Sequence, residues 1–381
     1  MTTVSVVLPV YNARAFLAFS IASLIEQTHG DFRIIAIDDG STDGSRSVLE
    51  AAAALDHRIT PIFRENRGLI ATLNEGLALA DTDFIARMDA DDIAFPTRLA
   101  AQLEAFETNT RLGLLGTNFN TLFSNTLVTP AAPAILAAPG ERAVLGRFCT
   151  SLRHPTVMFR RSRLASAELQ YDSRYPHAED FDLFRRLALS TSIAEMAEPQ
   201  LAYRLHSGSI SSTRLTQMCE THLQILEENL QRHYPPAAAT GLSRIVASLD
   251  TDSADTAAEL ICRLDALANV QPDEEKAAFA SGVDTTVYFF YAIMCRARAY
   301  HLAHRFIDRA DRWNSIRRRE RAVLRSFSAH AGMTLSQWQV GIQRLLGSRP
   351  LSRTLPGYAE IVKRARAIEL AAHQDRKQHA A

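Results

Sequence analysis

This 381-residue chain has no closely spaced cysteine pair, no excess of positive or negative charge and no long apolar segment. Its four cysteines are far apart, with no Cys-x-x-Cys pair, so the sequence predicts no zinc or redox motif. Scattered thiols fit a reducing cytosol. Lys plus Arg and Asp plus Glu both number 42, which leaves no net field to attract nucleic acid. We therefore expect no nucleic-acid partner.

Segments for export or for crossing a membrane are missing as well. Residues 1–4 carry no basic charge, and the apolar run at residues 4–10 is too short for the core of a signal peptide. A later apolar run at residues 287–295 is far shorter than a membrane span. We expect a cytoplasmic protein, and a peripheral contact with the inner face of the cell membrane stays open. The length suggests two domains, or one large domain with an appendage.

The first hundred residues alternate predicted strands with predicted helices. Four apolar, β-branched runs indicate buried strands at residues 4–10, 32–37, 59–63 and 84–88. Nearly continuous apolar runs are typical of parallel strands covered on both faces. We therefore predict a doubly wound α/β sheet. No Gly-x-Gly-x-x-Gly follows the first strand and no P-loop motif occurs, which argues against a dinucleotide fold and a P-loop NTPase.

Polar residues follow each of these strands, and open α/β sheets bind ligands at this edge. They are Tyr11 and Asn12, Asp38 and Asp39, Asn66 and Gly68, and Asp89, Asp91 and Asp92. Three acids within four residues repel one another unless a cation lies among them, and Mg²⁺ or Mn²⁺ prefers such oxygen ligands together with substrate phosphates. The last group therefore predicts a metal–diphosphate site, with a solvated acidic loop as the alternative.

The next hundred residues add a histidine, an acid pair and a polar loop. His154 begins an expected strand over residues 153–161, where a structural hydrogen bond is the alternative to a direct role. Glu179 and Asp180 begin an expected helix, where acids also suit the helix dipole. His206 lies in a Gly- and Ser-rich loop, where a surface histidine is the alternative to a functional one.

Taken in order, these motifs resemble the donor-binding half of family 2 glycosyltransferases with a GT-A fold. The resemblance rests on residues 4–12, 38–41, 66–68 and 89–92 and on the tail at residues 93–102. It implies an inverting enzyme of the bacterial cell-surface polysaccharide or glycolipid type. Such an enzyme uses a nucleotide-sugar donor, which we expect to be a UDP-sugar, and a glycan or lipid-linked acceptor.

The resemblance also implies a role for each residue. The expected donor-binding residues are Pro9, Tyr11, Asn12, Asp38, Asp39, Asn66, Gly68, Asp89 and Arg204. Asp91, with Asp89 and His206, is expected to hold Mg²⁺ or Mn²⁺, and His154 to face the acceptor. Asp180 is the expected general base, with Glu179 as the next candidate. Inverting sugar transfer needs one such carboxylate within reach of the attacking hydroxyl.

Beyond residue 212 helical periodicity replaces the strand signals, and the resemblance stops. We predict two domains, a GT-A domain at residues 1–212 and an all-helical domain at residues 213–381. Ten arginines and only three acids lie between Arg296 and Arg325, which indicates a solvated helix face or a surface that docks on anionic lipid. Two alternative functions remain, a sugar nucleotidyltransferase and a non-catalytic interaction protein with a degenerate transferase domain.

Overall fold

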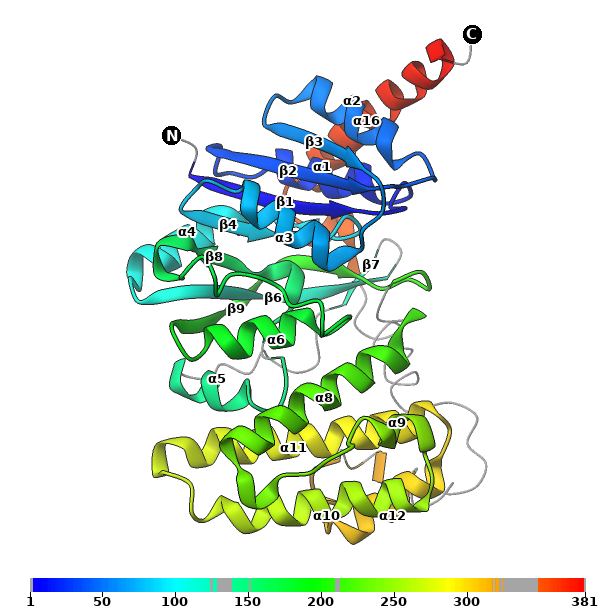
Figure 1. Cartoon of the computed structure of the whole chain (residues 1–381). Coiled ribbons are helices and arrows are strands. Elements are labelled where there is room, and N and C mark those ends of the chain that lie inside the picture. The colour runs from blue at the N-terminus through cyan, green and yellow to red at the C-terminus, as the bar shows by residue number, and fades with distance from the viewer. Residues whose placement is uncertain are drawn as a thin grey trace.

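The computed structural model describes residues 3–123, 126–128, 139–150, 152–209, 213–316, 318, 320, 321, 324 and 349–379. Figure 1 shows two stacked parts, a sheet flanked by helices and a cluster of helices below it. The last helix lies beside the first two helices of the sheet part, so the end of the described chain returns to its beginning.

In the described part of the chain, ten strands form one mixed sheet. They are β1 (Val4–Val10), β2 (Phe32–Asp39), β3 (Ile59–Arg64), β4 (Phe84–Arg87), β5 (Ile93–Ala94), β6 (Leu112–Phe123), β7 (Thr126–Val128), β8 (Met158–Arg160), β9 (Ser192–Arg204) and β10 (Arg349–Pro350). Their order is β3-β2-β1-β4-β8-β6-β7-β10, and β9 pairs with β5 and β6. The pairs β1/β2, β2/β3 and β1/β4 are parallel, whereas β8 is antiparallel to both of its neighbours. Parallel strands end at one edge, so the loops after β1 to β4 converge there.

Helices cover both faces of this sheet. The described helices, with single turns of 3₁₀ helix marked η, are α1 (Leu17–Ile25), α2 (Ser45–Leu55), α3 (Leu69–Leu79), α4 (Arg98–Thr108), α5 (Pro139–Leu145), η1 (His154–Thr156), η2 (Arg161–Arg163), α6 (Glu179–Leu187), α8 (Leu215–His233), η3 (Pro235–Ala237), α9 (Arg244–Ser248), α10 (Thr251–Ala268), α11 (Asp273–Arg296), α12 (Tyr300–Arg309), α15 (Leu351–Thr354) and α16 (Tyr358–His379). Val6 and Leu8 of β1 pack with α1, α2, α4 and α16, and Val7 packs with α3 and α6 on the other face. A strand covered on both sides is apolar at every position, which explains the runs in the sequence.

The predicted fold class is confirmed, and one expected strand is shorter than predicted. Residues 154–156 form the 3₁₀ turn η1, and β8 begins only at Met158. Pro155 has no N–H for a sheet ladder and so favours the turn. The sequence analysis did not predict the 13-residue strand β9, although its end at Arg204 lies beside the candidate site.

A second apolar core lies in the helical part. Helices α8 to α12 pack around it, together with α5 and with Phe148, which follows α5 in the chain. Gly282 of α11 lies so close to Phe148 that a Cβ would come within 2.3 Å of its ring. Within the described residues, α11 is the one helix long and apolar enough to cross a membrane, and 61% of its apolar window is buried in the fold. A core helix of a globular fold has the same character.

The C-terminal residues do not all belong to the helical part. Ile361 and Ile368 of α16 are buried in the core of the sheet part, and β10 pairs with β7. Both guanidinium nitrogens of Arg14 donate to the carboxylate of Glu369, at 2.6 and 2.5 Å. The predicted division at residue 212 stays a proposal, and α16 is a segment whose contacts cross it.

Candidate active site

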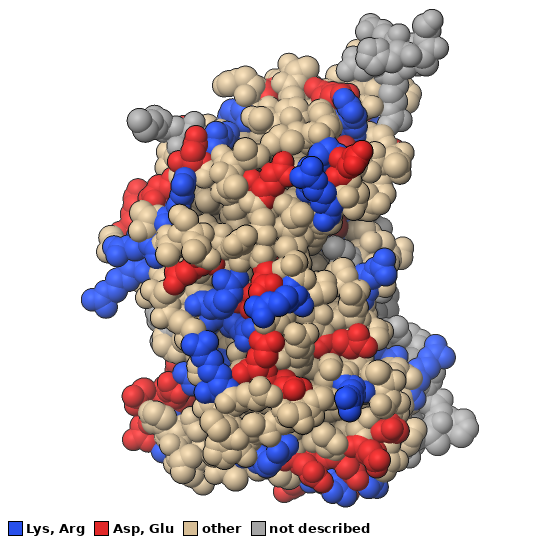
Figure 2. Space-filling view, in the orientation of Figure 1, with Lys and Arg blue, Asp and Glu red and all other residues tan. Residues whose placement is uncertain are grey.

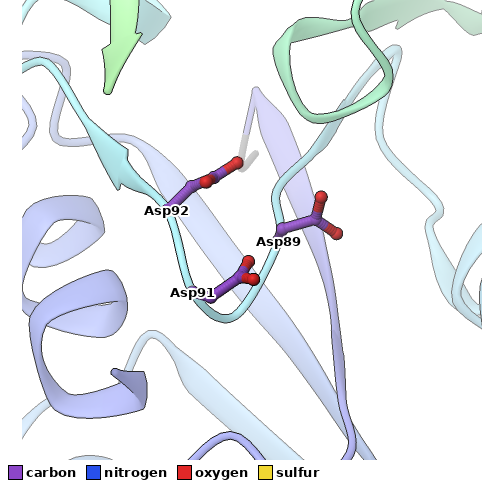
Figure 3. Close-up of side chains that lie close together, drawn as sticks. All are labelled: Asp89, Asp91 and Asp92. Carbon is purple, nitrogen blue, oxygen red and sulfur yellow. The ribbon is translucent and has the colours of Figure 1, made fainter. Parts of the chain in front are cut away.

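Three acids lie on the tight loop between β4 and β5 (Figure 3). Asp89 and Asp92 stand on the two arms of this loop, and Asp91 lies near its tip. One carboxylate oxygen of each residue lies within 4.8 Å of the others. The Asp92 N–H and the Ser20 hydroxyl both donate to the carbonyl of Asp89, at 3.4 and 2.9 Å, which holds the turn. The loop therefore gathers three carboxylates at the carboxyl end of β4, where the sequence predicted them.

Two buried arginines lie next to these acids. Nη2 of Arg87 pairs with Asp89 at 2.5 Å, and no described residue bonds its Nε or Nη1. Arg98 donates to the carbonyl of Arg87 at 2.7 Å, and burial together with the charge of Arg87 lowers the pKa of Arg98 to about 9. The two positive charges offset part of the repulsion among the acids. Arg87 was not among the predicted site residues, although a cation at the end of an apolar strand was a visible signal.

Burial and mutual repulsion make two of the acids harder to ionise. Burial raises the pKa of Asp92 well above its ordinary value, and the charges of Asp91 and Asp89 raise it further. Burial also raises the pKa of Asp89, with Arg87 opposing the shift and the charges of Asp91 and Asp180 adding to it. A divalent cation among these carboxylates would remove much of this cost.

The donor atoms of the loop fit a hard divalent cation. The Oδ2 atom of Asp92 is buried and has no hydrogen-bond partner among the described residues. The side chains of Asp89 and Asp91 are both 27% exposed, so a ligand can reach them. Carboxylate oxygens are the ligands that Mg²⁺ and Mn²⁺ prefer. Asp92 thus joins Asp89 and Asp91 as a candidate ligand, a role that the family resemblance had not assigned to it.

The end of β9 lies over the acid loop. The backbone N–H of Arg204 donates to Oδ1 of Asp92 at 2.7 Å, and its Nε donates to the carbonyl of Asp91 at 2.6 Å. Nε2 of His206 lies 2.8 Å from Oδ2 of Asp91. The structure therefore brings together Asp89, Asp91 and His206, the predicted metal ligands. Nε2 of His206 can bond to Asp91 or ligate a metal, but not both at once.

The loops after β2 and β3 hold each other through Asp39. Its carboxylate accepts the backbone N–H groups of Arg67 and Gly68, each at 2.8 Å, and pairs with Arg64 at 2.9 Å. The side chain of Asn66 donates to the carbonyl of Asp39 at 2.9 Å. Gly68 has a φ of +87°, which favours glycine. Asp39, Asn66 and Gly68 therefore shape this loop, and their contact with a donor stays a prediction.

The loops after β1 and β2 are joined in the same way. Oδ1 of Asn12 accepts the N–H of Thr42, and Oδ1 of Asp38 accepts the N–H of Ser41, both at 2.9 Å. Tyr11 is 56% exposed, which leaves its ring available to a ligand.

A cavity of about 540 Å³ opens beside these loops. Its lining residues are Asp38, Gly40, Ser41, Arg46, Phe63, Arg64, Glu65 and Asn66. Two of the predicted donor-binding residues, Asp38 and Asn66, therefore face one cavity. Pro9 is buried within β1 opposite Ile37, and its predicted donor contact stays a prediction.

The acid pair at the start of α6 lies close to the acid loop. The charge of Asp180 contributes to the raised pKa of Asp89, so the two carboxylates interact. Burial raises the pKa of Asp180. Burial, followed by the charge of Asp180, raises the pKa of Glu179 to about 7. A partly buried carboxylate with a raised pKa is suited to accept a proton.

His154 has a buried partner on each ring nitrogen. Its Nε2 lies 2.8 Å from the Tyr171 hydroxyl, and its Nδ1 lies 3.8 Å from Oε1 of Glu179. Burial, together with the charge of Arg87, lowers the pKa of His154 well below its ordinary value. Asn74 exchanges two hydrogen bonds with the backbone of Tyr171, at 2.9 and 2.8 Å. His154 therefore lies next to Glu179 in the fold. That it faces the acceptor stays a prediction.

The arginines of α12 and the turn after it are paired with acids of the helical part. Arg305 and Arg309 bind Asp255 at 2.6 and 3.2 Å, and Arg312 binds Asp265. Figure 2 shows Lys and Arg interspersed with Asp and Glu over the visible face. Three of the ten arginines in this stretch lie outside the described residues. These ion pairs favour the solvated-face interpretation over a bare basic surface.

The arrangement of sheet, acid loop and helices is that of a GT-A glycosyltransferase. The crystal structure of S. aureus TarS 1-349 in complex with UDP-GlcNAc aligns with a TM-score of 0.50 and 16% identity. The alignment covers 85% of this chain and 91% of the TarS chain. At this identity the likeness shows the fold.

Sequence relatives identify the family. The model of Glycosyl transferase family 2 matches residues 5–162. An uncharacterized glycosyltransferase of Haemophilus influenzae is 31% identical over 246 residues, which is 60% of this chain and 73% of that protein. The putative glycosyltransferase EpsE of Bacillus subtilis is 35% identical over 224 residues, 55% of this chain and 77% of that protein. The chain belongs to glycosyltransferase family 2 and is a glycosyltransferase.

Proposed function

We propose that this enzyme transfers a sugar from a nucleotide-sugar donor to a hydroxyl of a glycan or lipid-linked acceptor, by a metal-dependent, inverting single displacement. One observation carries the proposal. The acid loop after β4 and the acid pair of α6 come from distant parts of the chain, yet they share neighbours. Arg87 pairs with Asp89 at 2.5 Å and donates its backbone N–H to the carbonyl of Val157. His154 of the same short segment lies 3.8 Å from Glu179. A site with two sets of acids can separate donor binding from proton removal.

The acid loop is the proposed donor side. Asp89, Asp91 and Asp92 would hold Mg²⁺ or Mn²⁺, with His206 as a further ligand or as the hydrogen-bond partner of Asp91. When bound, such an ion offsets the charge that grows on a leaving diphosphate. The guanidinium of Arg204 lies beside Asp91 and would add a positive charge to the same group.

Asp180 is the proposed general base. Its carboxylate accepts the proton of the acceptor hydroxyl as the hydroxyl oxygen bonds to the anomeric carbon and the bond from that carbon to the diphosphate oxygen breaks. Attack opposite the leaving group inverts the anomeric centre. Glu179 is the next candidate, but it is more deeply buried, with a residue exposure of only 5%.

A uridine diphosphate sugar is the proposed donor. The cavity beside Asp38 and Asn66 lies along the same loop edge as the acid loop and offers hydrogen-bond acceptors for a base. Oδ2 of Asp39 accepts the N–H of Gly68 and keeps capacity for a second donor. Tyr11 adds an exposed ring on which a base can stack.

Release of nucleoside diphosphate from nucleotide sugars tests the proposal. UDP-GlcNAc, the ligand of the TarS structure, is the first probe, followed by other UDP-, GDP- and dTDP-sugars, each with Mn²⁺ and then with a chelator. We expect turnover of one donor, which stops when the metal is removed. Equal turnover with the chelator would refute the metal role of the acid loop, and turnover of GDP- or dTDP-sugars alone would refute the choice of UDP.

The same assay addresses the two alternative functions. A sugar nucleotidyltransferase would consume a nucleoside triphosphate and release pyrophosphate, and family membership already stands against it. A degenerate domain would turn over no donor, although the presence of Asp91, Asp180 and His206 together argues against that outcome.

The proposed location is cytoplasmic, with a peripheral contact of the helical part at the inner face of the cell membrane as the alternative. Sedimentation with neutral and anionic vesicles tests that contact. Equal binding of the protein to neutral and anionic vesicles would refute a role of the helical part in docking on anionic lipid.

A further inference from the structure

Helix α8 of the helical part faces two ways. Leu223, Leu226 and Leu230 point into the core of the helical part. Ile225, on another side of the same helix, is buried in a small cluster with Tyr175, Ala178 and Phe181. Those three residues surround the acid pair in the sequence, because Ala178 precedes Glu179 and Phe181 follows Asp180. One helix therefore joins the helical core to the segment that carries the proposed base.

Polar contacts repeat this link one turn further along α8. Oε2 of Glu228 accepts hydrogen bonds from the Tyr175 hydroxyl and from the Arg185 guanidinium, both at 2.7 Å. Arg185 also donates to Oδ1 of Asn229 at 2.8 Å, and Asn229 donates to the carbonyl of Arg147 at 2.9 Å. The side chain of Arg185 is only 14% exposed, whereas that of Glu228 is 36% exposed. Charge-assisted bonds of this kind hold the C-terminal half of α6 and the segment just before the helix against α8.

An aromatic stack makes a third link. The ring of His222 on α8 lies 4.7 Å from that of Phe181 and 4.3 Å from that of Phe289 on α11, measured between ring centroids. His222, Ile225 and Glu228 are spaced at three-residue intervals, which places them on one side of a helix. The backbone N–H of Phe181 in turn donates to Oδ1 of Asp180 at 2.8 Å. The stack thus ends at a residue bonded directly to the acid.

We propose that α8 is the element that positions the acid pair against the donor side, with Glu228 and His222 as positioning residues. The inference rests on the proposed function, since it concerns the geometry of the proposed base. No contact from α8 reaches the acid loop among the contacts described, and that loop is held by β4, β9 and α1. Loosening α8 should therefore disturb proton removal and leave donor binding unchanged.

Glu228→Gln tests the proposal, and Glu275→Gln on α11 is the matched control. Both glutamates pair with an arginine and are about one-third exposed, but Glu275 binds Arg147 instead of α6. Two measurements are made on the full chain, amide hydrogen exchange and the kinetics of the donor that the wild type turns over. For Glu228→Gln we expect roughly tenfold faster exchange in residues 179–187 and unchanged exchange in β1 to β4. We also expect kcat to fall on the order of tenfold, with the same KM for the donor.

Two further variants keep the test decisive. Tyr175→Phe removes the hydroxyl that donates to Glu228 and accepts from Arg185, and it retains the packed ring. It covers the case in which Glu228→Gln does not fold. Glu228→Asp keeps the charge and should recover part of the lost kcat, which a purely structural role would not require.

Unchanged exchange in residues 179–187 for both Glu228→Gln and Tyr175→Phe would overturn the proposal, and so would faster exchange with unchanged kcat. An equal fall in kcat for Glu275→Gln would also overturn it, because the effect would then belong to the helical part as a whole. If the wild type turns over no nucleotide sugar, the proposed function fails, and the exchange data still decide whether α8 holds α6.

Discussion

The two sets of acids at the candidate site are held in different ways. Asp89, Asp91 and Asp92 lie on one short loop, fixed by neighbouring sheet strands and the first helix. Glu179 and Asp180 begin a helix whose position depends on a partner helix from after residue 213. The first set is a local product of the sheet edge, and the second depends on tertiary packing. Substitutions should therefore separate the two sets by what they disturb.

The largest expected effect is on the donor side. Asp91→Ala should remove metal-linked donor binding and lower transfer on the order of 1,000-fold, because the leaving diphosphate loses its counter-charge. Calorimetry with UDP and Mn²⁺ measures the binding. Asp81→Asn is the control, since Asp81 is 77% exposed at the opposite end of β4 and pairs only with Arg33 among the described residues. Normal UDP–Mn²⁺ binding by Asp91→Ala would show that Asp91 is not a metal ligand.

Asp180→Asn should impair proton removal from the acceptor hydroxyl and leave donor binding intact. We expect kcat to fall about 100- to 10,000-fold with the donor KM nearly unchanged, because a general base contributes that much and does not hold the donor. Steady-state kinetics with Glu179→Gln in parallel decide the assignment. A larger loss in Glu179→Gln than in Asp180→Asn would make Glu179 the base.

Arg87→Met should disturb both sets at once, because the positive charge of Arg87 lowers the pKa values of Asp89, Glu179 and Asp180. Without it these folded-state pKa values rise, so the fold loses stability as pH rises above the unfolded values and regains it in acid. We expect a loss of about 3 kcal/mol at pH 8 and a smaller one at pH 5, measured by urea unfolding.

The matched control for this change is Lys276→Met, which breaks the exposed pair with Asp273 and should cost less than about 1 kcal/mol at either pH. An Arg87→Met loss that is the same at both pH values would show that packing, and not charge, is the role of Arg87.

The smallest expected effect concerns the proton on Glu179. Its pKa of about 7 in the fold lies above the unfolded value, so the wild type loses stability as pH rises from 5 to 8. Glu179→Gln lacks this contribution, and its stability relative to the wild type should grow over this range by on the order of 2 kcal/mol. Unfolding curves at both pH values measure this. Parallel pH dependence of the two proteins would mean that Glu179 titrates normally.

The sequence predicted the sheet part well because its signals are local. The apolar run of residues 4–10 became β1, and the acids after the fourth run reached the carboxyl end of β4. Asp38 and Asn66 reached one cavity because parallel strands end at a common edge. The sequence did not show that the carboxylate of Asp39 would be used to hold the next loop, since that depends on a partner in another segment.

Other features could not be predicted because they depend on pairing across the fold. β9 carries mixed polar and apolar residues and becomes a strand by pairing with β6. The basic character of α12 disappears once acids such as Asp255 pack beside it. Arg87 acquires its importance from acids that lie about 90 residues further along the chain.

By itself the sequence determined the alternation of strands and helices, the family, and the placing of acids at strand ends, because hydrophobic period and motif order are properties of neighbouring residues. Only the tertiary structure decided that Asp180 stands near Asp89, that α16 returns to the sheet part, and that α8 holds α6. These arrangements follow from which apolar and charged surfaces bury one another, and that choice is made by the whole chain at once.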